Sequence, residues 1–145
     1  MEINITPIGL VRNGIRKPKG EDWQTVTSEI IINEHLKEAL NRIEEFSHLI
    51  VIYWMHKLAP SQRSVMKVHP KGNQKLPLVG VFASRSPGRP NPVGITTVKL
   101  LERRENVLSV LGLDAIHGTP VLDIKPFIPG NDSPNEFKTP SWIKT

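Results

Sequence analysis

Alternating apolar and polar residues run through most of this chain, and this spacing predicts short β-strands. Successive side chains of a strand point to opposite faces, so an alternating segment buries one face and exposes the other. We expect strands at 3–11, 23–32, 79–83, 94–103, 107–115 and 121–124. The continuous apolar run at 46–56 predicts one more strand, buried on both faces or running through the core.

One short helix is expected among these strands. Asn33 is a typical N-cap, and the apolar residues that follow it fall on one face of a helix over 34–43. Residues 104–106 are the expected turn of a hairpin, 59–75 is a polar loop with a short strand around 65–68, and 127–145 is an irregular C-terminal tail. This pattern predicts a mainly β, largely antiparallel barrel or sandwich.

The overall composition is that of one globular domain, residues 1–145. Cysteine is absent, which excludes disulfides, thiolate metal sites and cysteine nucleophiles and is typical of a cytoplasmic protein. No apolar run is long enough to cross a bilayer and no secretion signal is visible, so no membrane partner is expected. Nineteen lysines and arginines against fourteen acidic residues favour a polyanion such as RNA, but only weakly.

The most distinctive segment is 79–95, which reads VGVFASRSPGRPNPVGI. Each of its three prolines fixes φ near about −65° and removes an N–H, so residues 84–92 form a stiff irregular segment, here called the proline loop. The loop holds Arg85 and Arg89 in a nearly fixed relation, and their guanidinium groups suit carboxylate or phosphate oxygens. A rigid connector with exposed arginines is the structural alternative.

Other candidate chemistry is sparse. The glycine-rich dinucleotide fingerprint and the Walker signature are missing, so a nucleotide-like ligand must be held in another way. The histidines are not paired at metal-ligand spacing, and no metal site is expected: His35, His48, His56, His69 and His117. His56 and Lys57 follow the apolar run, where the chain can meet a ligand or simply face water. His117 lies in a polar turn that Gly118 and Pro120 alone would explain.

Asp123 interrupts the apolar run 121–124, and a carboxylate on a core strand needs hydrogen-bond donors. We expect Asp123 to pair with Arg85 or Arg89 and so to orient the proline loop. Catalysis by Asp123 itself is the less favoured role, because a buried ion pair is usually structural.

Three segments together, 46–56, 80–94 and 114–126, closely resemble the TsaA-like, or TrmO, family, and Ile8–Arg12 also fits. This resemblance covers nearly the whole chain. It implies a small single-sheet β-barrel, usually a homodimer, that binds S-adenosylmethionine. This fold is unlike that of the doubly wound methyltransferases. The characterised family activity methylates N6 of N6-threonylcarbamoyladenosine next to the anticodon of certain tRNAs, so tRNA is the expected substrate.

Carried over by motif, the resemblance implies cofactor contacts at His56, Lys57, Arg85, Ile95, Ala115, Ile116, His117, Gly118, Thr119 and Pro120. An arginine can bind the methionine carboxylate or an RNA phosphate, and backbone groups of the 115–120 turn can read an adenine edge against an aliphatic wall. The acceptor nitrogen must lose a proton, and His117 or Asp114 is the candidate general base. Arg89 and Asn91 are candidate substrate contacts.

The first loop departs from the family pattern. Many members carry a Pro-Arg-Gln triplet there, whereas residues 16–23 read RKPKGEDW without a glutamine, so Pro18–Gly20 or 21–23 would have to take its place. Longer bacterial members also carry a C-terminal domain thought to help bind tRNA, while this sequence ends soon after Trp142. Two alternatives therefore stay open: a methyltransferase of the same fold with a small-molecule acceptor, and a non-catalytic RNA-binding barrel.

Overall fold

The computed structural model describes residues 1–19 and 22–144 and divides the chain into two compact units. The barrel unit comprises Met1–Lys57 and Val93–Phe127, and the second unit comprises Leu58–Pro92 and Ile128–Thr145. Among the described residues, no helix is long and apolar enough to cross a membrane. That residues 1–145 behave as a single domain stays a prediction.

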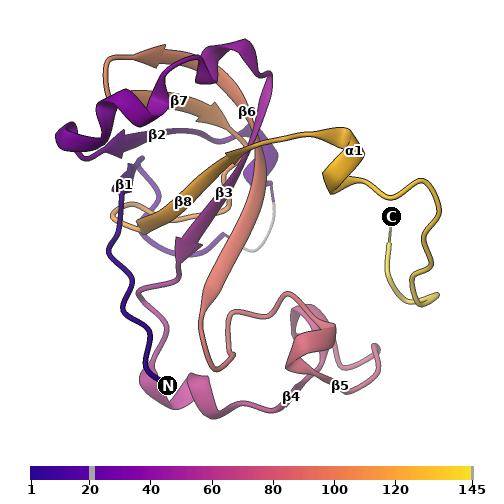
Figure 1. Ribbon diagram of the computed structural model, residues 1–145. Helices are drawn as coiled ribbons and strands as arrows, with labels where there is room; N and C mark the ends of the chain where they lie inside the picture. Colours follow the sequence, from indigo (N-terminus) through magenta and orange to yellow (C-terminus); the bar gives the residue numbers. More distant parts are fainter. Residues whose placement is uncertain (20–21, 145) are drawn as a thin grey trace. The chain divides into compact units, whose positions relative to one another are not determined.

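Six antiparallel strands close the barrel in the order β1-β2-β7-β6-β3-β8 (Figure 1). Their bounds are Gly9–Arg12 (β1), Thr27–Ile32 (β2), His48–Trp54 (β3), Val93–Arg104 (β6), Val107–Leu111 (β7) and Pro120–Pro126 (β8). Closure pairs β8 with both β3 and β1, so each strand of the sheet has two neighbours. The prediction of a mainly β, antiparallel, single-sheet barrel is confirmed.

The alternating side chains fill the barrel interior with aliphatic residues. On β3, Leu49, Val51 and Tyr53 are buried while the residues between them are only partly covered. Of the two alternatives for this strand, burial on both faces is wrong, and β3 instead runs through the barrel with its alternate side chains in the core. The fully buried aliphatic residues of the other strands are Val11, Ile30, Val98, Leu108, Val110 and Val121. Burial of this apolar surface is the main force that stabilises the barrel.

Tyr53 brings a polar group into this interior. Its hydroxyl lies 2.9 Å from the Thr96 hydroxyl, and its ring packs directly over Gly94 of β6. A Cβ at Gly94 would overlap the ring, so glycine is required here by close approach. The register pairs Tyr53 with Gly94, and this contact fixes that end of the β3–β6 ladder.

Several strand boundaries differ from the predictions. The expected strand 3–11 is ordered as β only from Gly9, since Pro7 cannot donate to a ladder, and a 3-10 helix (η1, Trp23–Thr25) precedes β2. The strand 107–115 ends at Leu111 because Gly112 adopts a φ of 94° and its N–H bonds to Val26. Strands β3 and β8 run over 48–54 and 120–126 rather than 46–56 and 121–124.

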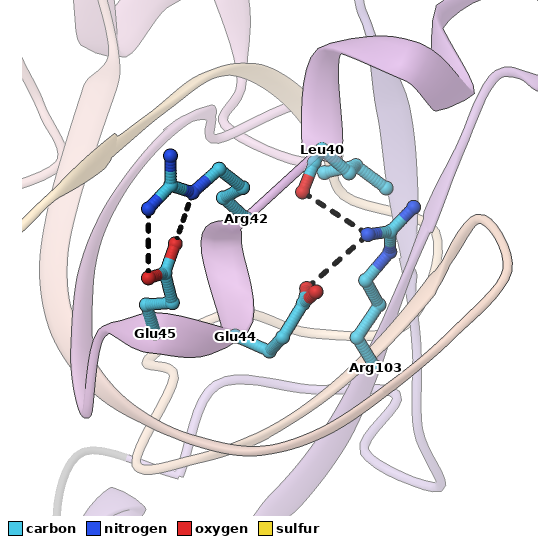
Figure 2. Close-up of polar contacts among 5 residues, drawn as sticks. All are labelled: Leu40, Arg42, Glu44, Glu45 and Arg103. Atoms are coloured by element: carbon cyan, nitrogen blue, oxygen red, sulfur yellow. Dashed lines mark hydrogen bonds and ion pairs between the residues drawn. The ribbon is translucent and has the colours of Figure 1, made fainter.

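The expected helix 34–43 is two 3-10 helices, Glu34–Leu40 (η2) and Ile43–Glu45 (η3). Arg42 adopts a φ of 72° between them, which no α-helix allows. The Asn33 side-chain oxygen makes no capping hydrogen bond, so the predicted cap is wrong, and its amide nitrogen donates to the Pro7 carbonyl. Arg103 of β6 binds both pieces: its Nη1 donates to the Leu40 carbonyl at 3.3 Å and to Glu44 at 3.2 Å (Figure 2).

The second unit contains short elements only. These are η4 (Pro60–Ser64), β4 (Lys67–Val68), η5 (Pro70–Gly72), β5 (Val79–Gly80), η6 (Val81–Ala83) and α1 (Pro129–Asp132). Strands β4 and β5 pair antiparallel, so the expected strand 79–83 is a two-residue strand followed by a 3-10 turn. The tail expected to be irregular contains the four-residue helix α1.

Candidate functional site

Three strand ends meet at one end of the barrel. The register pairs Trp54 with Val93, Tyr53 with Val121, and Leu10 with Pro120. Residues directly after β3, at the start of β6 and directly before β8 are therefore neighbours at this end. These are the positions of His56, the exposed Lys57, Ile95 and the 115–120 turn, so the barrel unit brings together the members of the predicted cofactor site that lie in it.

The 115–120 turn, Ala115–Pro120, is held by β1 and by the segment that follows it. The His117 N–H donates to the Ile15 carbonyl at 2.7 Å, and the Gly118 N–H donates to the Val11 carbonyl at 2.8 Å. The Thr119 N–H and hydroxyl both donate to the Ile116 carbonyl. Three of the backbone donors expected to read a ligand are therefore used within the chain, whereas the His117 and Gly118 carbonyls accept no bond from the described residues.

Asn13 connects this turn to the rest of the barrel. Its amide group donates to the Ala115 carbonyl at 3.0 Å and to the Ser28 hydroxyl at 2.9 Å, and its oxygen accepts the Ile15 N–H at 2.9 Å. Ser28 is 1% exposed, so a buried polar group is satisfied by the same side chain. Sequence reasoning missed Asn13 and Ser28, because both lie far from the turn in the sequence and Asn13-Gly14 is typical of an ordinary loop.

The backbone N–H of Asn13 donates to Nδ1 of His117 at 3.2 Å. Nδ1 is therefore an acceptor, and in the neutral imidazole the proton is assigned to Nε2. In this tautomer Nε2 is a hydrogen-bond donor and has no lone pair to accept a proton. The ring thus offers an N–H group, and the predicted role of His117 as general base stays a prediction that needs a change of tautomer.

His56 lies against the same turn. A Cβ placed at Gly118 would come within 3.8 Å of Nε2 of His56, and Gly118 itself has a φ of 84°. Nδ1 of His56 is buried and has no hydrogen-bond partner among the described residues. Burial, and secondly the charge of Lys57, lower the pKa of His56 below 6.5, so the imidazole is held in its neutral form. An unsatisfied buried nitrogen of this kind favours a bound polar group.

Asp114 directly precedes the turn. Although the residue is exposed by area, the neighbouring chain partly desolvates its carboxylate, and this burial raises the pKa of Asp114 above 3.8. A carboxylate with a raised pKa is a better proton acceptor than an ordinary aspartate. The raised pKa is therefore compatible with the predicted base at Asp114, which stays a prediction.

Ile95 lies on the outer face of the barrel and is 48% exposed. Its register partner is Ile52 of β3, and the next pair toward the end of the barrel is Tyr53 with Gly94. Side chains directly opposite in a ladder share a face, so Ile95 and Ile52 together form an apolar surface beside the strand ends. This surface fits the predicted aliphatic wall.

The proline loop belongs to the second unit. Arg89 donates to the Val81 carbonyl at 2.7 Å and to the Ser84 carbonyl at 3.2 Å, and Asn91 accepts from Arg63 at 3.3 Å. The predicted substrate contacts Arg89 and Asn91 thus have structural partners of their own. Arg85 is exposed and has no such partner among the described residues, so it is the guanidinium of the loop that remains available for a ligand.

Asp123 differs from its prediction. Its side chain is 48% exposed, one carboxylate oxygen lies 3.0 Å from the Lys125 ammonium, and the other accepts the Ile124 N–H. The expectation of a buried carboxylate is wrong, because this outward-facing β8 position reaches solvent and a lysine two residues away. Pairing with Arg85 or Arg89 of the second unit stays a prediction. Within the described residues, no group of three or more histidine and acidic side chains could hold a metal ion.

Comparison with known proteins places this barrel in a defined class. The family model of the tRNA-methyltransferase O N-terminal domain matches residues 14–133. A probable S-adenosyl-L-methionine-binding protein of Methanothermobacter thermautotrophicus is 43% identical over 137 residues, covering 92% of this chain and 96% of that protein. The chain belongs to the tRNA-methyltransferase O family, as the sequence predicted.

More distant relatives are longer than this chain. The human tRNA (adenine(37)-N6)-methyltransferase is 38% identical over 104 residues, which are 72% of this chain and 23% of the human protein. The crystal structure of TrmO from Pseudomonas aeruginosa superposes with a TM-score of 0.77 at 28% identity, covering 95% of this chain and 61% of that one. The barrel is therefore shared, while the chain spans less than two thirds of these longer proteins.

Proposed function

We propose that this protein is an S-adenosylmethionine-dependent tRNA methyltransferase that acts on N6 of adenosine, with N6-threonylcarbamoyladenosine beside the anticodon as the acceptor. The observation that carries the proposal is the meeting of the 115–120 turn, His56 and Ile95 at one end of the barrel. Relatives named as S-adenosyl-L-methionine-binding proteins and as a tRNA methyltransferase support it.

The residues at this end fit such a cofactor. The His117 and Gly118 carbonyls can accept from an adenine amino group, Nε2–H of His117 can donate to a ring nitrogen, and Ile95 can cover the ring face. The unsatisfied Nδ1 of His56 can bind a further polar group. Arg85 of the proline loop would bind the carboxylate of the methionine part, as the family resemblance implies.

The cofactor supplies a methyl group activated on a sulfonium. This chain's residues would hold that group in line with the acceptor nitrogen, and such positioning supplies much of the rate. A carbamoylated exocyclic nitrogen is a poor nucleophile until it loses its proton. The Asp114 carboxylate, with its raised pKa, would accept that proton as the N–C bond forms and the C–S bond breaks.

Assembly and location are part of the same proposal. We infer a homodimer, as the family resemblance implies, and a cytoplasmic location, which the absence of cysteine favours. A concentration series by light scattering tests the dimer, and a mass equal to one chain at micromolar concentration would contradict it.

Calorimetric titration with S-adenosylmethionine is the first test. We expect wild-type protein to bind, Arg85→Ala to bind at least about tenfold more weakly, which corresponds to about 1.4 kcal/mol, and Arg104→Ala to match wild type. Arg104 is a suitable control because it is exposed on β6 and paired with Glu102. Absence of binding by wild type would contradict the proposal, and equal binding by Arg85→Ala would contradict the role of that residue.

A transfer assay then identifies the acceptor. Labelled methyl groups should enter tRNA that carries threonylcarbamoyladenosine and not the same tRNA without the modification. Transfer to both would indicate an unmodified adenosine acceptor. Transfer only to components of a small-molecule extract would favour the alternative acceptor suggested by the altered first loop at 16–23, of which Gly20 and Glu21 lie outside the described residues.

A further inference from the structure

The positive charge of this chain is concentrated in one segment of the second unit. Residues 58–92, here called the basic segment, contain no aspartate or glutamate and six cations: Arg63, Lys67, Lys71, Lys75, Arg85 and Arg89. The whole chain has a net charge of +5, so the six charges of this segment leave the remainder with a net charge of −1. The basic segment therefore accounts for the whole net positive charge of the protein.

Three lysines of the basic segment lie within residues 67–80, a loop whose two ends are paired as strands β4 and β5. Strands β4 and β5 pair Lys67 with Gly80 and Val68 with Val79, and His69 Nδ1 lies 2.9 Å from the Leu76 carbonyl. The side chains of Lys67, on β4, and of Lys71 and Lys75, in the loop, are all exposed. Gly80, the register partner of Lys67, has no side chain to pack against this lysine.

These lysines have no acidic partners. Among the described residues, Lys67, Lys71 and Lys75 form no ion pair, whereas several cations of the barrel unit do, for example Arg12 with Glu29 and Arg104 with Glu102. Arg63 and Arg89 already bind backbone carbonyls of the same unit and so shape it. Lys67, Lys71, Lys75 and Arg85 remain as uncompensated charges, which a polyanion can neutralise with release of its counterions.

An exposed aromatic ring accompanies these charges. Phe82 on η6 is 83% exposed, and Met66 and Leu78 are 75% and 55% exposed. A solvent-exposed ring beside unpaired cations is typical of surfaces that bind single-stranded nucleic acid, where bases stack on the ring and phosphates contact the cations. A folded acidic protein or a lipid headgroup layer would use the charges and leave the ring without a stacking partner.

We propose that the basic segment is the RNA-docking surface of this protein, with Lys67, Lys71 and Lys75 on phosphates and Phe82 stacked on an unpaired base. The proposal rests on the proposed function, since it assumes a tRNA substrate, and it assigns docking to residues outside the methyl-transfer site. Docking at this surface holds the RNA loop while the barrel end carries out the chemistry.

Two lysine variants of equal charge test the electrostatic part. In the first, Lys67, Lys71 and Lys75 are each replaced by Gln; in the control, Lys99, Lys138 and Lys144 are each replaced by Gln. Binding of fluorescently labelled tRNA is measured by anisotropy at several salt concentrations. We expect the first variant to bind tRNA about tenfold or more weakly, and the slope of log affinity against log salt concentration to become smaller by up to about 3. The affinity of the control should stay within about twofold of wild type. Equal losses in both variants would overturn the proposal.

Phe82→Ala, with Phe137→Ala as control, tests the stacking part. Phe137 is 71% exposed in the C-terminal tail and serves as an aromatic ring of similar exposure. Loss of a stacked base should weaken tRNA binding by about fivefold to a hundredfold in Phe82→Ala only. If Phe82→Ala instead changes the mass in light scattering and leaves tRNA affinity intact, the ring is a protein contact and the proposal is wrong.

A failure of the proposed function and a failure of the docking surface would be distinguished by different measurements. Titration with S-adenosylmethionine and transfer at saturating tRNA are measured on the same variants. Wild-type protein that neither binds the cofactor nor methylates tRNA would contradict the proposed function, whatever the variants do. Wild-type activity together with an unchanged KM for tRNA in the first lysine variant would contradict the docking surface alone.

Discussion

The backbone N–H of Asn13 donates to Nδ1 of His117, although 104 residues separate the two in the sequence. The contact ties the end of β1 to the 115–120 turn, and the Asn13 side chain strengthens it through Ala115 and Ser28. One residue outside the predicted site thus sets both the shape of the turn and the tautomer of its histidine.

Asn13→Ala should destabilise the barrel by about 1–3 kcal/mol, because it removes three hydrogen bonds and leaves the Ala115 carbonyl without a donor. Urea denaturation measures the free energy of unfolding. Asn33→Ala is the control, since it removes one exposed bond to Pro7, and it should cost less than about 0.5 kcal/mol. Equal losses in the two variants would show that the Asn13 contacts add no stability.

His56 should titrate below its ordinary pKa of 6.5, which NMR can follow at its ring protons. Burial is the larger cause and Lys57 the smaller, so Lys57→Gln should raise the midpoint only part of the way back. A lowered histidine pKa contributes stability above pH 6.5 that is lost as the pH falls through the folded value. His56→Gln should therefore reduce acid sensitivity; a midpoint at or above 6.5 in wild type would contradict the burial of the ring.

Asp114→Asn should change the free energy of unfolding only slightly and the rate of methyl transfer strongly. Because the pKa of Asp114 is raised, the favourable protonated form contributes stability below about pH 3.8 that is lost as the pH rises through the folded value. The variant should thus be slightly more stable than wild type at pH 7 and equal to it near pH 3. If Asp114 is the base, the methyl-transfer rate should fall by about 10²–10⁴-fold. An unchanged rate would exclude Asp114 from that role.

Arg103→Ala should loosen the two 3-10 helices. Its side chain is 20% exposed and binds Leu40, Glu44 and the Glu105 carbonyl, so its loss should cost about 1–3 kcal/mol in unfolding free energy. Arg42→Ala is the matched control, because the Arg42–Glu45 pair next to it is exposed to solvent and its loss should change the free energy of unfolding much less (Figure 2). Equal effects would mean that the carbonyl contacts of Arg103 are not important.

The sequence predicted the strands well because alternation is a direct consequence of a half-buried sheet. It did not predict where strands end, since the end of β7 depends on the positive φ of Gly112 and that of β1 on a missing donor at Pro7. An α-helix and two 3-10 helices share nearly the same apolar spacing, so η2 and η3 were not distinguishable from one helix.

The candidate site was predicted where a motif marks it and missed where only the fold makes the contact. The 115–120 turn and His56 carry local signals, whereas Asn13 acquires its role through closure of the barrel. The absence of acidic residues from 58–92 was visible in the sequence, and counting the two charge types separately along the chain would have found it. That Arg89 binds carbonyls of its own unit was not visible, since an arginine suits many acceptors.

Closure of the barrel has a consequence for motion. Strand β1 meets β8 through only two register pairs, Gly9 with Val121 and Leu10 with Pro120, whereas β3 and β6 share seven. The β1–β8 seam is therefore the joint expected to open first in local fluctuations. The Val11 N–H donates to Thr119 and the Gly118 N–H to Val11, so opening the seam would also release the 115–120 turn. A ligand held by that turn should close the seam and slow amide exchange on strand β1, far more than on β6.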